Sequence, residues 1–116
     1  MKILIILNDP PYGTERSYNG LRLANSLLKA DETLELTVFL MADAVACAKR
    51  GQQTPDGYYN LERMLKQTVR RGSVLLCGTC LDARGLQPEE ILDGCARSTM
   101  PELTELTLAS DRVLVF

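Results

Sequence analysis

Short apolar runs alternate with helix-like segments along this chain, and this order constrains its fold more than any other feature. The runs occupy residues 3–7, 73–76 and 113–116, while residues 34–41 alternate in hydropathy before becoming wholly apolar. Continuous runs of this length are typical of strands buried on both faces of a sheet. Strands that alternate with helices form a parallel sheet with helices packed on both sides. The order therefore predicts an α/β fold.

The segments between the apolar runs have apolar residues at helical spacing and, at their ends, residues that are typical of helix termini. We expect helices over residues 15–29, 42–48 and 61–70, and a last helix that begins at Pro101. Asn60 is suited to cap the helix that follows it. Pro88 suits the first turn of a further short helix, which Gly94 closes. Residues 49–59 form the one long loop, whose functional interpretation is a lid or an oligomer contact.

Length and charge exclude several classes of protein. A chain of 116 residues suits one domain, residues 1–116. The net charge is −2 and no continuous basic stripe is present, so we expect no direct nucleic-acid partner. No segment approaches the roughly 18 apolar residues of a membrane span, and no signal-peptide pattern is visible. We therefore expect no membrane partner and a cytoplasmic location, where the four cysteines remain thiols.

Three segments follow the ends of expected strands. They are residues 8–14, 41–43 and 77–85. Because the carboxyl ends of parallel strands meet at one edge of the sheet, and ligands bind outside that edge, we expect a site where these segments meet.

Cys77 and Cys80 form a C-x-x-C pair directly after an apolar run, in a chain that has no histidine. A structural zinc site needs four ligands, and no second C-x-x-C is present, so we expect neither a metal nor a cofactor. The pair fits dithiol redox chemistry, or transport of sulfur as a persulfide on one thiol. A packing role for Cys77 stays open, because free cysteine behaves as a small hydrophobe. Cys47 and Cys95 are expected to be packing thiols.

Two charged residues follow the cysteine pair. If residues 81–84 begin a helical turn, its backbone N–H groups face the pair and lower the pKa of a thiol. Arg84 would add positive charge beside the thiols, whereas Asp82 would oppose that effect.

The loop after the first apolar run offers three further candidates, Tyr12, Gly13 and Glu15. Gly13 exposes backbone N–H groups that suit an anion at the start of a helix. Glu15 is a candidate base, although an acidic residue at this position also simply favours a helix N-terminus. Tyr12 is interpreted more simply as a packed side chain in a rigid proline turn.

Several segments together resemble the DsrE/DsrF-like family, and within it the YchN-type members. The resemblance covers essentially the whole chain, and the order and spacing of the segments make it specific. The matching segments are residues 11–15, 21–24, 39–45, 50–52, 57–58, 77–85 and 110–114.

The resemblance implies a three-layer α/β/α fold with a mostly parallel, five-stranded sheet, assembled into homo-oligomers that are trimers or hexamers. It also implies a sulfur-relay function, in which a cysteine accepts sulfur from a donor protein as a persulfide and passes it to an acceptor protein. In such relatives the sulfur-carrying cysteine stands eight positions before the glycine of an Arg-Gly pair. Counted back from Gly85, that position is Cys77. Cys80 matches a cysteine of YchN-type members.

The sequence thus predicts a cytoplasmic protein that carries sulfur as a persulfide, with Cys77 and Cys80 as the reactive pair. Its activity would be at most that of a sulfurtransferase-like protein. Two other functions stay open. One is a non-catalytic oligomeric binding or scaffold protein whose cysteines only pack, and the other is a dithiol redox protein that uses the pair.

Overall fold

A computed structural model describes residues 1–56 and 58–116 of the chain. Gly57, which belongs to the predicted long loop and to one of the matching segments, lies outside the described residues. Within the described part, five strands form a single sheet in the order β4-β3-β2-β1-β5, and every neighbouring pair is parallel. The strands are β1 Lys2–Leu7, β2 Glu35–Leu40, β3 Ser73–Cys77, β4 Cys95–Ser98 and β5 Arg112–Val115.

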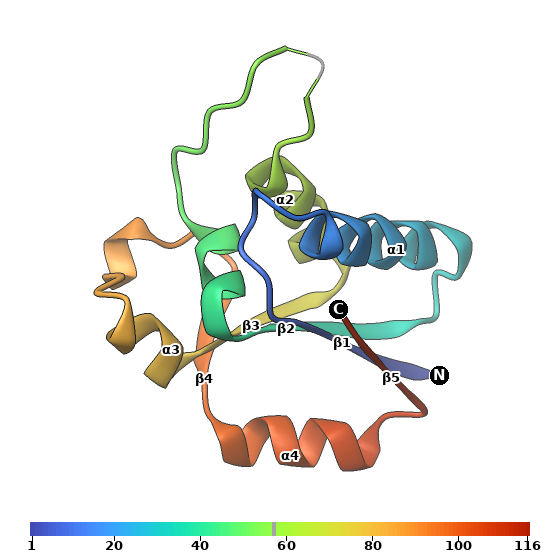
Figure 1. Ribbon diagram of the computed structural model, residues 1–116. Helices are drawn as coiled ribbons and strands as arrows, with labels where there is room; N and C mark the ends of the chain where they lie inside the picture. The colour runs from blue at the N-terminus through green and yellow to red at the C-terminus, as the bar shows by residue number, and fades with distance from the viewer. Residues whose placement is uncertain (57) are drawn as a thin grey trace.

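Helices cover both faces of the sheet, so the predicted three-layer α/β fold is confirmed. They are α1 Arg16–Ala30, α2 Leu61–Arg71, α3 Gly78–Ala83 and α4 Met100–Ala109, with 3₁₀ helices η1 Ala42–Ala48 and η2 Pro88–Glu90. The helices α1 and α2 pack on one face and α4 on the other, while α3 lies beyond one end of the strands (Figure 1). Over residues 1–56 and 58–116, none of these helices has the length and apolar character needed to cross a bilayer.

The two faces of the sheet bury side chains to different extents. Most of the core lies on the face of the sheet that α1, α2 and η1 cover. The side chains of Ile3, Ile5 and Leu7 of β1 point toward this face. The cluster beneath α4 is smaller and consists of Leu4, Phe39, Cys77 and Leu103. Cys77 is therefore buried among apolar side chains on the α4 face.

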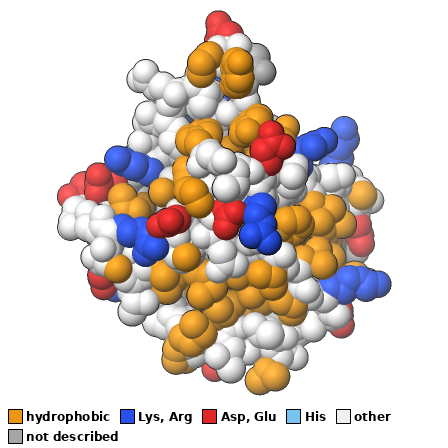
Figure 2. All heavy atoms as spheres, viewed as in Figure 1, with side chains coloured by type: hydrophobic (Ala, Val, Ile, Leu, Met, Phe, Trp, Pro, Cys, Tyr) orange, Lys and Arg blue, Asp and Glu red, His pale blue; other side chains and the backbone are white. Residues whose placement is uncertain are grey.

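The α4 face is covered incompletely near β5. Val113 and Val115 are 37% and 63% exposed, and Leu108 of α4 is 83% exposed. Figure 2 shows apolar side chains gathered on this side of the molecule, over the C-terminal strand and α4. One helix is too narrow to cover the whole face, which leaves an apolar surface at this edge of the sheet.

One local prediction was wrong. Gly94 does not close a helix: η2 ends at Glu90, and Gly94, with φ of 90°, turns the chain into β4. No apolar run marked this fifth strand, because β4 is an edge strand that pairs only with β3 and leaves Ala96 and Arg97 exposed.

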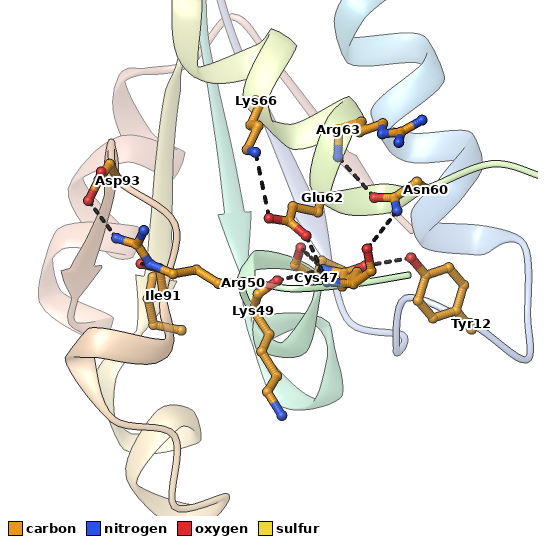
Figure 3. A network of polar contacts seen from close by, with 11 residues as sticks. Tyr12, Cys47, Lys49, Arg50, Asn60, Glu62, Arg63, Lys66, Ile91 and Asp93 are labelled. Atoms are coloured by element: carbon orange, nitrogen blue, oxygen red, sulfur yellow. Dashed lines mark hydrogen bonds and ion pairs between the residues drawn. The ribbon is translucent and has the colours of Figure 1, made fainter. Parts of the chain in front are cut away.

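Asn60 caps α2 as predicted and also anchors the long loop. Its Oδ1 accepts a hydrogen bond from the N–H of Arg63 at 3.1 Å, while its Nδ2 donates to the carbonyl of Gln52 at 3.0 Å. Gln52 in turn accepts a hydrogen bond from the hydroxyl of Tyr12 at 2.6 Å (Figure 3). The base of the loop is thus tied to the first turn of α2.

We expect Asn60→Ala to lower the free energy of unfolding by about 1–2 kcal/mol, because it removes a helix cap and a second hydrogen bond at a buried position. Urea denaturation measures the change. Asn60→Ser is the matched control: it keeps a capping oxygen for the N–H of Arg63, loses the donor to Gln52, and should lose less stability. Equal stability of the wild type and Asn60→Ala would contradict this account of the cap.

Candidate functional site

The candidate site lies where three strands end at the same level. The register pairs Leu7 of β1 with Leu40 of β2, and Leu40 with Leu76 of β3. The segments that leave these ends are the ones predicted to meet, residues 8–14, 41–43 and 77–85. Two of them are joined by hydrogen bonds, since the N–H of Ala42 donates to Cys80 and Arg84 donates to Asp43.

Cys77 is both the last residue of β3 and the residue that precedes the first turn of α3. It is only 6% exposed, and its Sγ lies 3.2 Å from the hydroxyl oxygen of Thr79. Burial raises the pKa of the Cys77 thiol, but hydrogen bonding from the Thr79 hydroxyl, the Cys80 thiol and backbone N–H groups of this turn outweighs it, so the pKa lies below its ordinary value. The thiolate of Cys77 is therefore more stable than that of an ordinary cysteine.

Cys80 lies one turn further along, inside α3, and has a different environment. Its Sγ accepts a hydrogen bond from the N–H of Ala42 at 3.2 Å. Burial and the hydrogen bond to Cys77 raise the pKa of the Cys80 thiol, and the opposing effect of the Ala42 N–H does not cancel them. The pKa of Cys77 therefore lies below that of Cys80, and Cys77 is the more acidic of the two thiols.

Ala42 also adopts an unusual backbone conformation. Its φ is 51°, in the left-handed region that costs an L-residue about 1–2 kcal/mol. Strain of this kind persists only where surrounding contacts over-determine the backbone.

The two charged residues predicted beside the cysteines each have an ion-pair partner. Arg84 donates from Nε to Asp43 at 2.8 Å and from Nη1 to the carbonyl of Cys80 at 3.1 Å. Asp82 accepts two hydrogen bonds from Arg97 of β4, at 2.9 and 2.6 Å, and hydrogen bonding to Arg97 lowers the pKa of Asp82. α3 is therefore tied to η1 by one pair and to the edge strand by the other.

The start of α3 differs from its prediction by three residues. The helical turn begins at Gly78 and not at Leu81, so Cys80 lies within it. Sequence reasoning also missed Thr79, Ala42 and Arg97. Thr79 was visible inside the C-x-x-C segment, whereas Arg97 belongs to the strand that no apolar run marked.

The loop candidates Tyr12, Gly13 and Glu15 make their described contacts elsewhere. The Tyr12 hydroxyl donates to Gln52 and accepts a hydrogen bond from the N–H of Leu61 at 3.3 Å. Glu15 accepts a hydrogen bond from the Tyr59 hydroxyl at 3.4 Å, and Gly13 has a φ of 100° with open space beside it. In the part of the chain that the structure describes, no hydrogen bond joins these three residues to the cysteine pair. Tyr12 and Glu15 therefore contact the long loop and the start of α2.

The other two cysteines have environments typical of packing thiols. Cys47 is fully buried, and burial raises its pKa to about 12. Burial also raises the pKa of Cys95, to about 11. Cys95 lines a pocket of about 510 Å³ between α3, η2 and β4, together with Leu86, Ile91 and Arg97. Among residues 1–56 and 58–116, no three Cys, Asp, Glu or His side chains are grouped so that they could hold a metal ion.

Comparisons with known proteins agree with this architecture. The sequence model of the DsrE/DsrF-like family matches residues 1–116. Protein YchN of Escherichia coli is 43% identical over 116 residues, which cover 99% of this chain and 98% of that protein. An uncharacterised protein of Methanocaldococcus jannaschii is 37% identical over 117 residues, with all of both chains covered.

Solved structures resemble the chain as well. The crystal structure of YchN from E. coli superposes with a TM-score of 0.94 and covers 99% of this chain and 98% of that one. A protein of unknown function from Methanobacterium thermoautotrophicum has a TM-score of 0.77 at 13% identity, over 99% and 97% of the two chains, which supports the fold alone.

We expect iodoacetamide to alkylate Cys77 at lower pH than Cys80, because the pKa of Cys77 lies below the ordinary thiol value and that of Cys80 above it. Thr79→Val should shift the Cys77 profile to higher pH, since it removes a hydroxyl from the sulfur. Peptide mass spectrometry resolves the two sites. Thr104→Val, which removes a comparable exposed hydroxyl in α4, should leave both profiles unchanged. A Cys80 profile that rises at lower pH than the Cys77 profile would overturn the assignment.

Proposed function

The chain belongs to the DsrE/DsrF-like family, and on that premise we propose that it is a sulfur-relay protein that carries sulfane sulfur as a persulfide on Cys77. The observation that carries the proposal is the set of hydrogen-bond donors around the Cys77 sulfur at a strand end. Such a group is suited to a sulfur anion, whether a thiolate or the terminal sulfur of a persulfide. The activity is at most sulfurtransferase-like, because sulfur is accepted and passed on without net oxidation or reduction.

Sulfur transfer to Cys77 is a thiol exchange reaction. The Cys77 thiolate attacks the outer sulfur of a persulfide on a donor protein. A new S–S bond forms at Cys77, the S–S bond of the donor breaks, and the donor cysteine leaves as a thiolate while the proton stays on the transferred sulfur. An acceptor thiolate then attacks the outer sulfur on Cys77 in the same way. The partners that this proposal requires are therefore a persulfide-bearing donor and a thiol-bearing acceptor.

Cys80 is assigned a supporting role in this proposal. If its thiolate attacked the inner sulfur of a Cys77 persulfide, a Cys77–Cys80 disulfide would form and hydrosulfide would be lost. The raised pKa of Cys80 keeps it protonated and opposes that loss. The protonated Cys80 thiol instead packs against the cluster that contains Cys77 and shields the sulfur from water. All four cysteines are free, which suits a reducing compartment, and we place the relay in the cytoplasm.

Two other functions each have an observation in their favour. The placement of Cys77 directly before α3 and of Cys80 within its first turn favours a dithiol redox protein. The low exposure of Cys77 favours a binding or scaffold protein in which both cysteines only pack. These functions differ from the relay in what happens when the protein meets a persulfide donor.

We expect the wild type to gain the mass of one added sulfur when it is incubated with a persulfide donor, as measured by intact mass spectrometry. Cys77→Ser should abolish the gain because it removes the accepting thiolate, whereas Cys80→Ser should retain it. Cys95→Ser, at a thiol of raised pKa, is the matched control and should load like the wild type. A disulfide in place of the added sulfur would favour the redox protein. No reaction at all, with a competent donor, would favour the scaffold.

We also propose that the protein is a homo-oligomer, a trimer or a hexamer, in which a neighbouring copy covers the exposed apolar surface of β5. Light scattering after size exclusion should give the mass of three or six chains. Val115→Glu should lower it, because Val115 is exposed in the single chain and a buried charge in an interface is costly. Gln67→Glu, on an exposed position of α2, adds the same charge to the opposite side of the sheet and should leave the mass unchanged. A monomeric wild type would contradict the proposal.

A further inference from the structure

The pocket of about 510 Å³ between α3, η2 and the edge strand β4 has no part in the proposed sulfur relay. Its apolar lining includes Leu76, Leu81, Leu86 and Ile91. Leu76 belongs to the main core cluster, whereas Cys77, the next residue of β3, packs in the cluster beneath α4. The pocket and the Cys77 side chain therefore lie on opposite faces of the sheet. The volume of the pocket lies in the range of small-molecule sites.

Backbone hydrogen bonds hold the walls of this pocket in place. Residues 90–92 run beside residues 48–50 and are joined to them by backbone hydrogen bonds of 2.8 and 2.9 Å. On the other wall, the N–H of Leu86 donates to the carbonyl of Leu81 at 3.1 Å and closes the turn that follows α3. The pocket is thus preformed, so a ligand would bind without first ordering its walls.

Arg50 and Arg97 are the cationic residues of the lining. Arg50 donates from Nε to the carbonyl of Ile91 at 2.8 Å and from Nη2 to Asp93 at 2.6 Å (Figure 3). Arg97 donates from both Nη atoms to Asp82. A guanidinium has more N–H groups than these contacts use in the described part of the chain, so each arginine retains donors for a further acceptor.

The two aspartates of these ion pairs face the solvent more than the arginines do. The Asp93 side chain is 94% exposed and that of its partner Arg50 only 46%. The difference has the same sign but is small for Asp82 and Arg97, at 64% and 57%. The guanidinium of Arg50 is therefore the more enclosed charge of its pair, which makes it the main candidate to meet an anionic group at the pocket.

We propose that this pocket binds a small molecule that has an apolar body and an anionic head group such as a carboxylate. The body lies against the leucine and isoleucine side chains of the lining, where burial of its surface stabilises the complex. The head group accepts charge-assisted hydrogen bonds from Arg50, with Arg97 as a second cation of the lining. Because the pocket does not include Cys77, the proposal is independent of the sulfur relay.

The test uses octanoate as the probe and 1-octanol as its neutral analogue of equal chain length. Isothermal titration calorimetry of the wild type should show saturable binding of octanoate, and octanol should bind roughly tenfold more weakly because it lacks the charge. Hydrogen exchange with mass spectrometry should show octanoate protecting peptides within residues 81–97. No saturable binding, protection centred elsewhere, or equal affinity for octanol and octanoate would overturn the proposal.

A first pair of variants tests the position of the ligand. Cys95→Phe places a ring in the pocket and should abolish the binding of both probes. Ala96→Phe adds the same side chain at the next, exposed position of β4, outside the lining, and should bind both probes like the wild type. Wild-type affinity in a folded Cys95→Phe would contradict the proposed site. If Cys95→Phe does not fold, the exchange pattern of the wild type decides the position.

A second pair of variants separates recognition of the head group from support of the wall. Arg50→Gln should weaken octanoate roughly tenfold and leave the affinity for octanol unchanged, because only the charged contact is lost. Arg16→Gln removes another exposed arginine that is paired with an aspartate, outside the pocket, and should change neither affinity. An equal loss for octanoate and octanol in Arg50→Gln would refute the role of Arg50 in binding the anion.

Discussion

The parallel register of β1, β2 and β3 is the constraint on which the rest of the structure depends. All three strands are buried, so their backbone groups must pair with one another, and the pairing ends them at one level with Leu7, Leu40 and Leu76. Burial of a polar or charged side chain inside such a sheet carries a desolvation cost. Reactive groups are therefore tolerated where the strand pairing ends. The cysteine pair follows β3 and η1 follows β2. They meet there because the register ends both strands at the same level.

The turn from β3 into α3 gives Cys77 two structural roles at once. As a strand residue it packs in the small cluster beneath α4 with Leu4, Phe39 and Leu103, which shields it from water. As the residue before the first helical turn it lies beside the Thr79 hydroxyl and the Cys80 thiol. Burial alone would make this cysteine inert, and the surrounding donors reverse that effect. A shielded sulfur that nevertheless favours its anion is suited to hold a labile sulfur atom.

Much of the fold could be predicted from the sequence because β1, β2, β3 and β5 are marked by apolar runs, and Asn60 marks the start of α2 by its capping chemistry. β4 could not be predicted in this way. An edge strand pairs on one side only, so it tolerates the small and charged residues of Cys95–Ser98, which carry no strand signal. The same limit applies to the site. Cys77 and Cys80 are three positions apart in the sequence and were predicted. Ala42 instead reaches Cys80, and Asp43 and Arg97 reach Arg84 and Asp82 of the same turn, through tertiary contacts that no local pattern encodes.

The two cysteines of the C-x-x-C pair differ because they belong to different elements. Cys77 ends a strand and Cys80 lies within a helical turn, so the two sulfurs have different surroundings: Cys77 lies beside the Thr79 hydroxyl, whereas Cys80 accepts a hydrogen bond from the N–H of Ala42. The spacing alone suggests a symmetric pair, as a dithiol redox site would use. The strand–helix junction breaks that symmetry, and the contacts of η1 with α3 hold the second thiol against the backbone N–H of Ala42. Within this fold, the chemistry of the pair is therefore decided less by its spacing than by where the strand ends.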